Sequence, residues 1–220
     1  MVNSKMAECV YCGTDKGLTR EHLWPKCLIE RTKHQSEIFL KAADRIIGGE
    51  PAIKDVCKKC NNIHLSNLDQ YISNLFDAYF NKFVNIDDII QFKFNYNYLS
   101  RWLLKTCYNS KRANNPENAI YFHQYKNYII EGKSTPKNLF IFLQLIIPYK
   151  IPEIERRQLS KELQHLKEIP PDYTRTGDIL LADNAYEEFF VNFVIINSYC
   201  FYLYFLKNAN SLHRNKRRAF

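Results

Sequence analysis

The chain has 220 residues, of which 46% are hydrophobic, and a formal net charge of +8 at pH 7. This composition excludes a disordered chain and indicates an acidic partner. There is no run of about 20 apolar residues and no apolar segment at the start, so we expect no membrane-spanning helix and no secretory signal, and hence a cytoplasmic protein.

The first feature along the chain is a pair of Cys-x-x-Cys motifs, Cys9 with Cys12 and Cys57 with Cys60. In a reducing compartment, cysteines at this spacing indicate a bound metal and not disulfides. Four thiolates from two such turns make a tetrahedral cage without an open position, which is typical of a structural zinc ion. On the cysteines alone we would expect a plain zinc ribbon.

Two short strands are predicted between the cysteine pairs. Residues 18–22 predict the first strand, and residues 52–56 predict its return after a turn at 48–51. The separation between them is long, which indicates an inserted loop or helix around residues 36–46.

The clearest helix follows the second cysteine pair and continues to about residue 84. We expect it to start near Asn61 or Asn62, because asparagine satisfies free backbone N–H groups at a helix start. Apolar residues recur at three- and four-residue spacing and predict a buried stripe. The stripe consists of Leu65, Leu68, Ile72, Leu75, Phe76, Tyr79 and Phe83.

The remaining sequence predicts a mixture of strands and helices. The expected elements are a strand at 89–94, buried strands at 139–147 and within 189–206, and helices at 98–112 and 153–167. We therefore expect an α+β protein in two parts, a module of residues 1–65 packed on a mixed α/β companion region of residues 66–220.

Three basic residues of the predicted helix 98–112, namely Arg101, Lys105 and Arg112, fall near one side. We expect this side to face solvent, and a phosphate-binding face is the less favoured alternative.

The residues around the cysteines carry a more specific pattern. Glu21 and His22 stand shortly before Pro25, and Asn61 directly follows the fourth cysteine. This combination, over about residues 9–65, resembles the four-cysteine zinc branch of the HNH (ββα-metal) endonucleases, which includes phage endonuclease VII-type modules. The resemblance implies a ββα-metal fold with structural Zn²⁺ and metal-dependent hydrolysis of phosphodiester bonds.

The resemblance also implies roles for individual residues. His22 resembles the general base, while Glu21 and Asn61 resemble two ligands of a catalytic Mg²⁺ or Mn²⁺. His64, one helical turn on, is similar in placement to the residue that completes this metal site, and Asn62 is the alternative to Asn61. Residues 23–56 contain no asparagine, so the middle Asn of many HNH proteins is absent there. In the four-cysteine branch the asparagine after the last cysteine corresponds to the N of the motif, and Asn61 resembles it.

The proposed chemistry is coherent without the family. A hard divalent ion held by carboxylate and amide oxygens stabilises charge that develops on a phosphate. A histidine with an ordinary pKa near 6.5 activates water at neutral pH.

Basic residues near the proposed site are the expected nucleic-acid contacts. Arg20 and Lys26 flank Glu21 and His22, and Lys58 and Lys59 lie between the second pair of cysteines. The alternative for the two lysines is that they are merely exposed. Trp24 is expected in the module core rather than as a platform for a base.

The sequence thus favours a metal-dependent HNH endonuclease acting on DNA, in phage defence, restriction or a mobile element. The residues do not distinguish RNA from DNA, but hydrolysis by water needs no 2′-hydroxyl, so DNA is preferred. The alternative is a non-catalytic zinc module that binds nucleic acid or a protein partner. A homodimer or a partner subunit is expected for double-strand cleavage, and the basic residues of 207–220 indicate a second contact with a polyanion.

Overall fold

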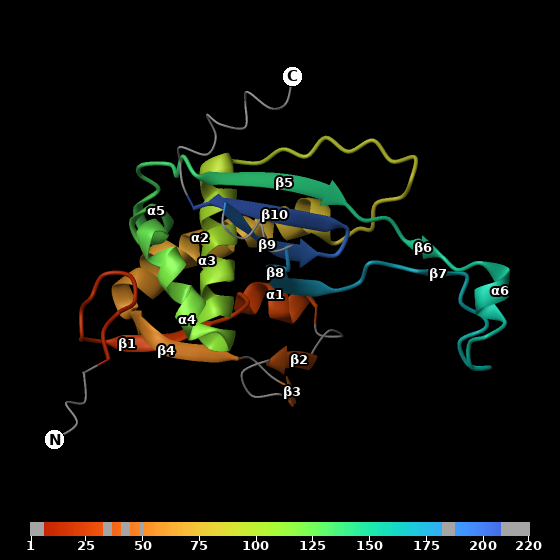
Figure 1. The fold of residues 1–220 in the computed structure, drawn as a ribbon, viewed down its shortest axis with the longest axis horizontal. Helices are drawn as coiled ribbons and strands as arrows, with labels where there is room; N and C mark the ends of the chain where they lie inside the picture. The colour runs from red at the N-terminus through yellow and green to blue at the C-terminus, as the bar shows by residue number, and fades with distance from the viewer. Residues whose placement is uncertain (1–6, 33–36, 41–44, 49–50, 182–187, 208–220) are drawn as a thin grey trace.

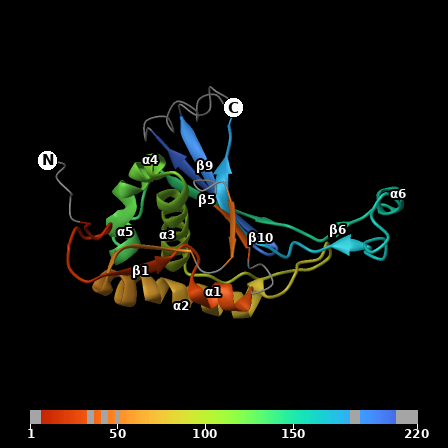
Figure 2. The same cartoon turned by 90° about the horizontal axis from the view of Figure 1, so that it is seen from below.

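The computed structural model describes residues 7–32, 37–40, 45–48, 51–181 and 188–207. Its elements are arranged in layers, in which helix α3 lies between a four-stranded sheet and helix α2 (Figures 1 and 2). None of the helices in these ranges is both long and apolar enough to cross a membrane. The elements in chain order are β1 (Leu18–His22), α1 (Lys26–Arg31), β2 (Glu37–Leu40), β3 (Arg45–Gly48), β4 (Ala52–Cys57), η3 (Cys60–Leu65), α2 (Ser66–Leu75), η4 (Phe76–Phe80), α3 (Tyr96–Asn114), α4 (Pro116–Ala119), η5 (Ile120–Tyr125), α5 (Lys126–Glu131), β5 (Leu139–Leu145), β6 (Tyr149–Lys150), α6 (Glu153–Arg156), β7 (Glu168–Ile169), β8 (Thr174–Ile179), β9 (Phe189–Ile196) and β10 (Tyr199–Leu206).

The N-terminal part consists of an antiparallel strand pair followed by a helix. Strands β1 and β4 pair with Leu18 opposite Cys57 and His22 opposite Ala52. The helix that follows β4 runs through η3, α2 and η4, with π-helical turns at both ends. Both predicted strands and the existence of the predicted helix are therefore confirmed. The predicted asparagine cap is wrong, because η3 already begins at Cys60 with no side-chain cap, and the Asn61 amide binds β1 instead. The helix also ends at Phe80, a few residues before the predicted end.

The helical stripe is buried as its spacing predicts. The side chains of Leu65, Leu68 and Ile72 are fully buried, and Tyr79 and Phe83 are half-buried at the far end. A 3.6-residue period keeps such side chains on one face, where they pack against α1 and α3.

Helix α3 contradicts the expectation of a solvated basic face. Asn95 caps it by accepting a hydrogen bond from the backbone N–H of Tyr98. Within the helix, Arg101 and Lys105 are buried, and the Arg112 guanidinium binds Asp55. The prediction failed because α3 has layers packed on two sides, so that its basic residues lie against partners and not against water.

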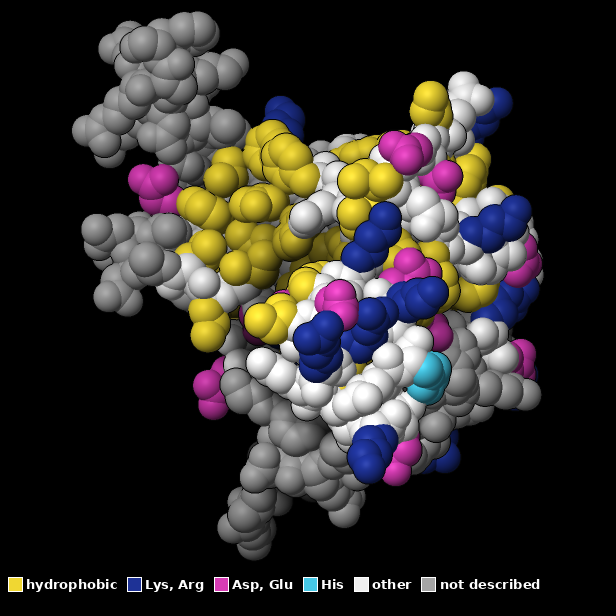
Figure 3. All heavy atoms as spheres, turned by 90° about the vertical axis from the view of Figure 1, so that its right-hand side faces the viewer, with side chains coloured by type: hydrophobic (Ala, Val, Ile, Leu, Met, Phe, Trp, Pro, Cys, Tyr) yellow, Lys and Arg dark blue, Asp and Glu magenta, His cyan; other side chains and the backbone are white. Residues whose placement is uncertain are grey.

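The sheet has the strand order β5–β10–β9–β8, and every pair in it is antiparallel. The predicted segment 189–206 is the hairpin of β9 and β10, which is largely buried as expected. The predicted strand at 139–147 is β5, but it is mostly exposed and not buried, because it lies at the edge of the sheet. One face of β10 is buried against the helices, whereas Phe140 and Phe142 of β5 are exposed on the other face of the sheet. Seen from the right-hand side of Figure 1, hydrophobic side chains gather at the upper left (Figure 3).

Two predicted elements are wrong. Residues 89–94 form no strand, because Phe92 makes ring contacts with Phe80 and Tyr199 that hold the segment without a backbone partner. The predicted helix 153–167 is reduced to the single turn of α6, which buries no side chain. Most helical stability comes from packing of an apolar face, so the rest of the segment does not continue the helix.

The predicted insertion around residues 36–46 lies partly outside the described residues, and its described part contains the antiparallel pair of β2 and β3. The basic tail beyond Lys207 also lies outside the described residues. The whole is an α+β protein in which one hydrophobic cluster runs from Cys9 and Tyr11 to Phe205.

Candidate functional site

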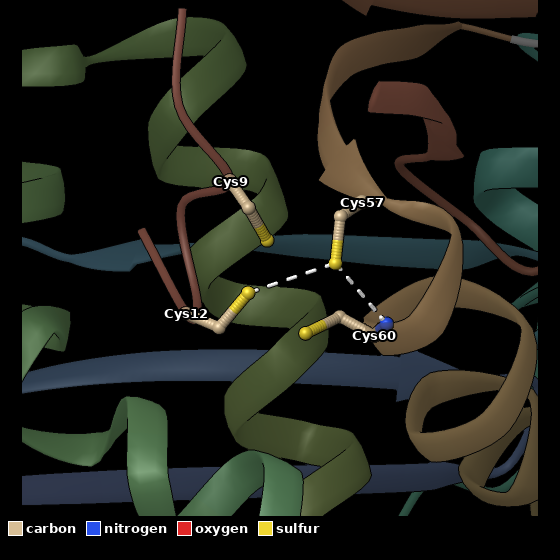
Figure 4. A group of neighbouring side chains, drawn as sticks. All are labelled: Cys9, Cys12, Cys57 and Cys60. Atoms are coloured by element: carbon tan, nitrogen blue, oxygen red, sulfur yellow. Dashed lines mark hydrogen bonds between the residues drawn. The ribbon is translucent and has the colours of Figure 1, made fainter. Parts of the chain in front are cut away.

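The four cysteines of the two predicted pairs come together at one place (Figure 4). Cys9 and Cys12 come from the turn before β1, Cys57 from the end of β4 and Cys60 from the start of η3. Their four Sγ atoms lie within 4.8 Å of one another, and those of Cys12 and Cys57 are 3.6 Å apart. Because a Zn–S bond is about 2.3 Å long, a tetrahedral zinc site needs sulfurs separated by about 3.8 Å. The cluster therefore fits a metal such as zinc in donor type, number and spacing.

The surroundings of the cluster favour thiolates unequally. Burial raises the pKa of Cys9, but hydrogen bonds from the backbone of Cys57, Cys12 and Tyr11 together have the larger effect. The net result is a pKa lowered to about 7. Burial also raises the pKa of Cys60, and hydrogen bonds with the thiols of Cys57 and Cys12 add to this rise. A divalent cation is what would allow all four sulfurs to be thiolates together.

Glu21 and His22 occupy the last two positions of β1. Glu21 is only 4% exposed, and its Oε1 accepts hydrogen bonds from Lys105 Nζ at 2.7 Å and Asn109 Nδ2 at 3.2 Å. Asn109 Nδ2 also donates to the backbone carbonyl of His22 at 3.0 Å, and the His22 side chain is half-buried. Two side chains of α3 thus hold one oxygen of the proposed metal ligand.

Lys105 connects Glu21 to a second carboxylate. Its Nζ lies 2.7 Å and 2.8 Å from the two oxygens of Asp69 on α2, and Trp102 Nε1 donates to the same carboxylate at 3.2 Å. Burial lowers the pKa of Lys105, but Asp69 and Glu21 raise it more, and the net direction is upward. Burial raises the pKa of Asp69, although Lys105 opposes the shift. With the lysine charged and both carboxylates ionised, the group carries one net negative charge.

Asn61 contacts β1 directly. Its Nδ2 donates to Thr19 Oγ1 at 2.9 Å and to the carbonyl of Arg20 at 3.0 Å. These contacts fasten the start of the helix next to the strand positions that precede Glu21. Asn62 is exposed and His64 is half-buried.

The four basic residues expected to contact nucleic acid are all exposed. Arg20 is a residue of β1, and Lys58 and Lys59 lie between Cys57, where β4 ends, and Cys60, where η3 begins. Lys26 is also exposed, and its Nζ is 3.8 Å from a carboxylate oxygen of Glu30. A pair this open to water restrains the lysine weakly.

Trp24 lies in the core, as the sequence favours. Its ring centroid is 6.2 Å from that of Trp102, and the half-buried side chain packs against the main hydrophobic cluster.

Sequence reasoning singled out Lys105 and Arg112 as basic residues of one helix but missed Asn109 and the contact of this helix with Glu21. Lys105, Asn109 and Arg112 recur at four- and three-residue spacing, which places them on one face of α3. A neutral asparagine between two basic residues on a helix face is a weak signal, and their carboxylate partners lie on other elements.

Among the described residues, the four cysteines are the only group of three or more His, Cys, Asp or Glu side chains within reach of one ion. Glu21 and Asn61 supply two oxygen atoms of the kind that Mg²⁺ prefers. Protein sites often hold Mg²⁺ with one or two carboxylates, completed by water and substrate phosphates. Comparison of the chain with protein-family models, with curated proteins and with solved structures gives no match, so the likeness to HNH endonucleases rests on the residues of this chain.

Proposed function

We propose that this protein is a metal-dependent HNH endonuclease that hydrolyses phosphodiester bonds of DNA. The observation that carries the proposal is the hydrogen-bonded junction between the helix start and β1, where Asn61 binds the carbonyl of Arg20 immediately before Glu21 and His22. The strand pair β1–β4, the four-cysteine cluster and the helix that begins at η3 adjoin one another along the chain, and this arrangement supports the proposal. A plain zinc ribbon gives no reason for Glu-His on the strand and Asn on the helix.

Each residue has a distinct task in this proposal. The cysteine cluster holds structural Zn²⁺ and fixes β4 and η3 to the turn before β1. Glu21 and Asn61 are the ligands of Mg²⁺ or Mn²⁺ in this proposal and His64 is the third, and this ion would stabilise charge on the phosphate when bound. His22 accepts the proton of the attacking water. Arg20, Lys26, Lys58 and Lys59 contact the phosphate backbone.

The first test is cleavage of supercoiled plasmid by the zinc-loaded full chain in Mg²⁺ or Mn²⁺. We expect the native protein to nick the plasmid and His22→Ala to be slower by roughly 10²- to 10⁴-fold, because the general base is lost. His165→Ala is the matched control, since His165 is an exposed histidine of the segment after α6. Zinc content measured on each protein shows whether the structural site is intact.

The outcome that contradicts the proposal is binding without cleavage. If native protein and His22→Ala both bind DNA and RNA but cut neither, the alternative of a non-catalytic zinc module replaces it. If RNA alone is cut, the nuclease assignment stands and the substrate changes.

A second comparison decides between the two asparagines. Asn61→Ala is expected to slow cleavage roughly 10-fold or more, since it removes a ligand and two contacts with β1. Asn62→Ala, at an exposed position one residue on, is expected to cleave at the native rate. Rates measured at several Mn²⁺ concentrations distinguish the two variants, and the reverse result would make Asn62 the ligand.

A further inference from the structure

The companion region reaches the proposed site through α3. Asn109 is fully buried, and its Nδ2 group donates to both Glu21 Oε1 and the His22 carbonyl. Its Oδ1 accepts a hydrogen bond from Arg112, which also binds Asp55 of β4. One side chain therefore links the proposed metal ligand, the backbone of the proposed base and the neighbouring strand.

We infer that Asn109, together with Lys105, is a positioning residue that orients the Glu21 carboxylate for its metal ion. This inference rests on the proposed function and assigns part of the active site to α3, outside residues 9–65. Neither side chain reaches solvent, so neither contacts the substrate.

The geometry explains how the orientation arises. Both donors bind the same oxygen, Oε1, and within the described residues no hydrogen bond is made by Glu21 Oε2. A carboxylate held by one oxygen presents the other in a fixed direction, as one ligand atom. Partners that orient a metal ligand in this way typically contribute 10- to 100-fold to metal affinity.

Asn109 gives a cleaner test than Lys105, because its removal changes no charge near the metal. Loss of the Lys105 ammonium would make the site more negative and attract a cation, while loss of orientation would weaken binding. These opposite effects are absent in Asn109→Leu, which keeps the approximate volume and removes the two donated hydrogen bonds together with the one accepted from Arg112.

Asn192 offers a matched control on β9. It is 2% exposed, and its Nδ2 donates to the carbonyl of Gly177 and to the carboxylate of Asp178, the same two kinds of partner. Asn192→Leu therefore also removes two donated hydrogen bonds from a buried asparagine, on a strand that contributes nothing to the proposed site.

The experiment measures Mn²⁺ binding to zinc-loaded protein without nucleic acid, from the free Mn²⁺ signal in electron paramagnetic resonance. We expect the native protein and Asn192→Leu to have the same Kd, and Asn109→Leu to bind roughly 10- to 100-fold more weakly with unchanged zinc content. Plasmid cleavage should show the same shift in the Mn²⁺ concentration for half-maximal rate.

A smaller folded fraction lowers the number of sites but leaves the Kd unchanged, so a merely structural role does not produce the shift. If Asn109→Leu does not fold, Asn109→Ala, which leaves space for a water molecule, is measured instead.

Two results would overturn the inference, and they are distinguishable. Equal Kd values for the Asn109 and Asn192 variants, with native protein binding Mn²⁺, would make Asn109 an ordinary core residue and leave the proposed function standing. Absence of Mn²⁺ binding by native protein would remove both the inference and the proposed metal-dependent cleavage.

Discussion

The double variant Cys57→Ser/Cys60→Ser is expected to lose its zinc ion and to melt at a much lower temperature than the native protein. Structural zinc sites contribute on the order of 10–16 kcal/mol of binding free energy, which is available only to the folded state. Here the cluster joins three segments, namely the turn before β1, the end of β4 and the start of η3. Even a loss of about 5 kcal/mol would lower the melting temperature of a chain this size by roughly 10–20 °C.

The measurement combines thermal unfolding by circular dichroism with the zinc content of the purified protein. Cys107→Ser is the control, because Cys107 is equally buried but lies in α3 and outside the cluster. It should keep one zinc per chain and lose only about 1–3 kcal/mol from a buried hydroxyl group. If the double variant retained zinc, or melted like the control, the cluster would not be a structural zinc site.

The second large effect is expected for Lys105→Met. Lys105 is 1% exposed and lies between the carboxylates of Glu21 and Asp69. Removal of one member of a buried ion pair costs about 3–5 kcal/mol, because the remaining charges stay buried without compensation. We therefore expect the urea midpoint to fall sharply, whereas the matched change Lys111→Met should cost about 1 kcal/mol or less, since its partner Asp178 is partly exposed.

The pH dependence of Lys105→Met gives an independent check. Without the ammonium, the folded-state pKa of the half-buried Asp69 carboxyl rises further above its unfolded value, in the direction that desolvation already imposes. A carboxyl with a raised folded pKa binds more protons in the folded state, so it favours folding at low pH and this advantage is lost as the pH rises. The stability deficit relative to native protein should therefore shrink between pH 8 and pH 5. A deficit independent of pH would mean that lost packing, and not unpaired charge, is the cause.

The cysteine cluster and the elements around it could be predicted from sequence because their signals are local. Cys9, Cys12, Cys57 and Cys60 identify themselves by spacing, and chelation of one ion requires all four sulfurs to meet. The stripe at Leu65, Leu68 and Ile72 follows the helical period directly, and burial of that stripe is the only favourable outcome in water.

Local signals failed where tertiary contacts decide. Residues 89–94 have a strand-like composition, but a strand also needs a backbone partner, and aromatic contacts from Phe92 hold the segment instead. Residues 153–167 have helix-forming composition but no apolar face to bury, so only α6 is helical.

The surroundings of Glu21 show the same division most clearly. The sequence determined that Glu21 and His22 end a strand near the cysteine turns and that a helix follows the second cysteine pair, with Asn61 in its first turn. Only the tertiary structure decided that Lys105 and Asn109 are buried against Glu21, since Asn109 lies 88 residues away in the chain. Basic residues on one face of a helix are stable either in water or against buried carboxylates. The sequence of the helix is the same in both cases, so it does not reveal which environment surrounds them. The choice was made by the packing of α3 between the sheet and α2, which brought Glu21 and Asp69 to the lysine.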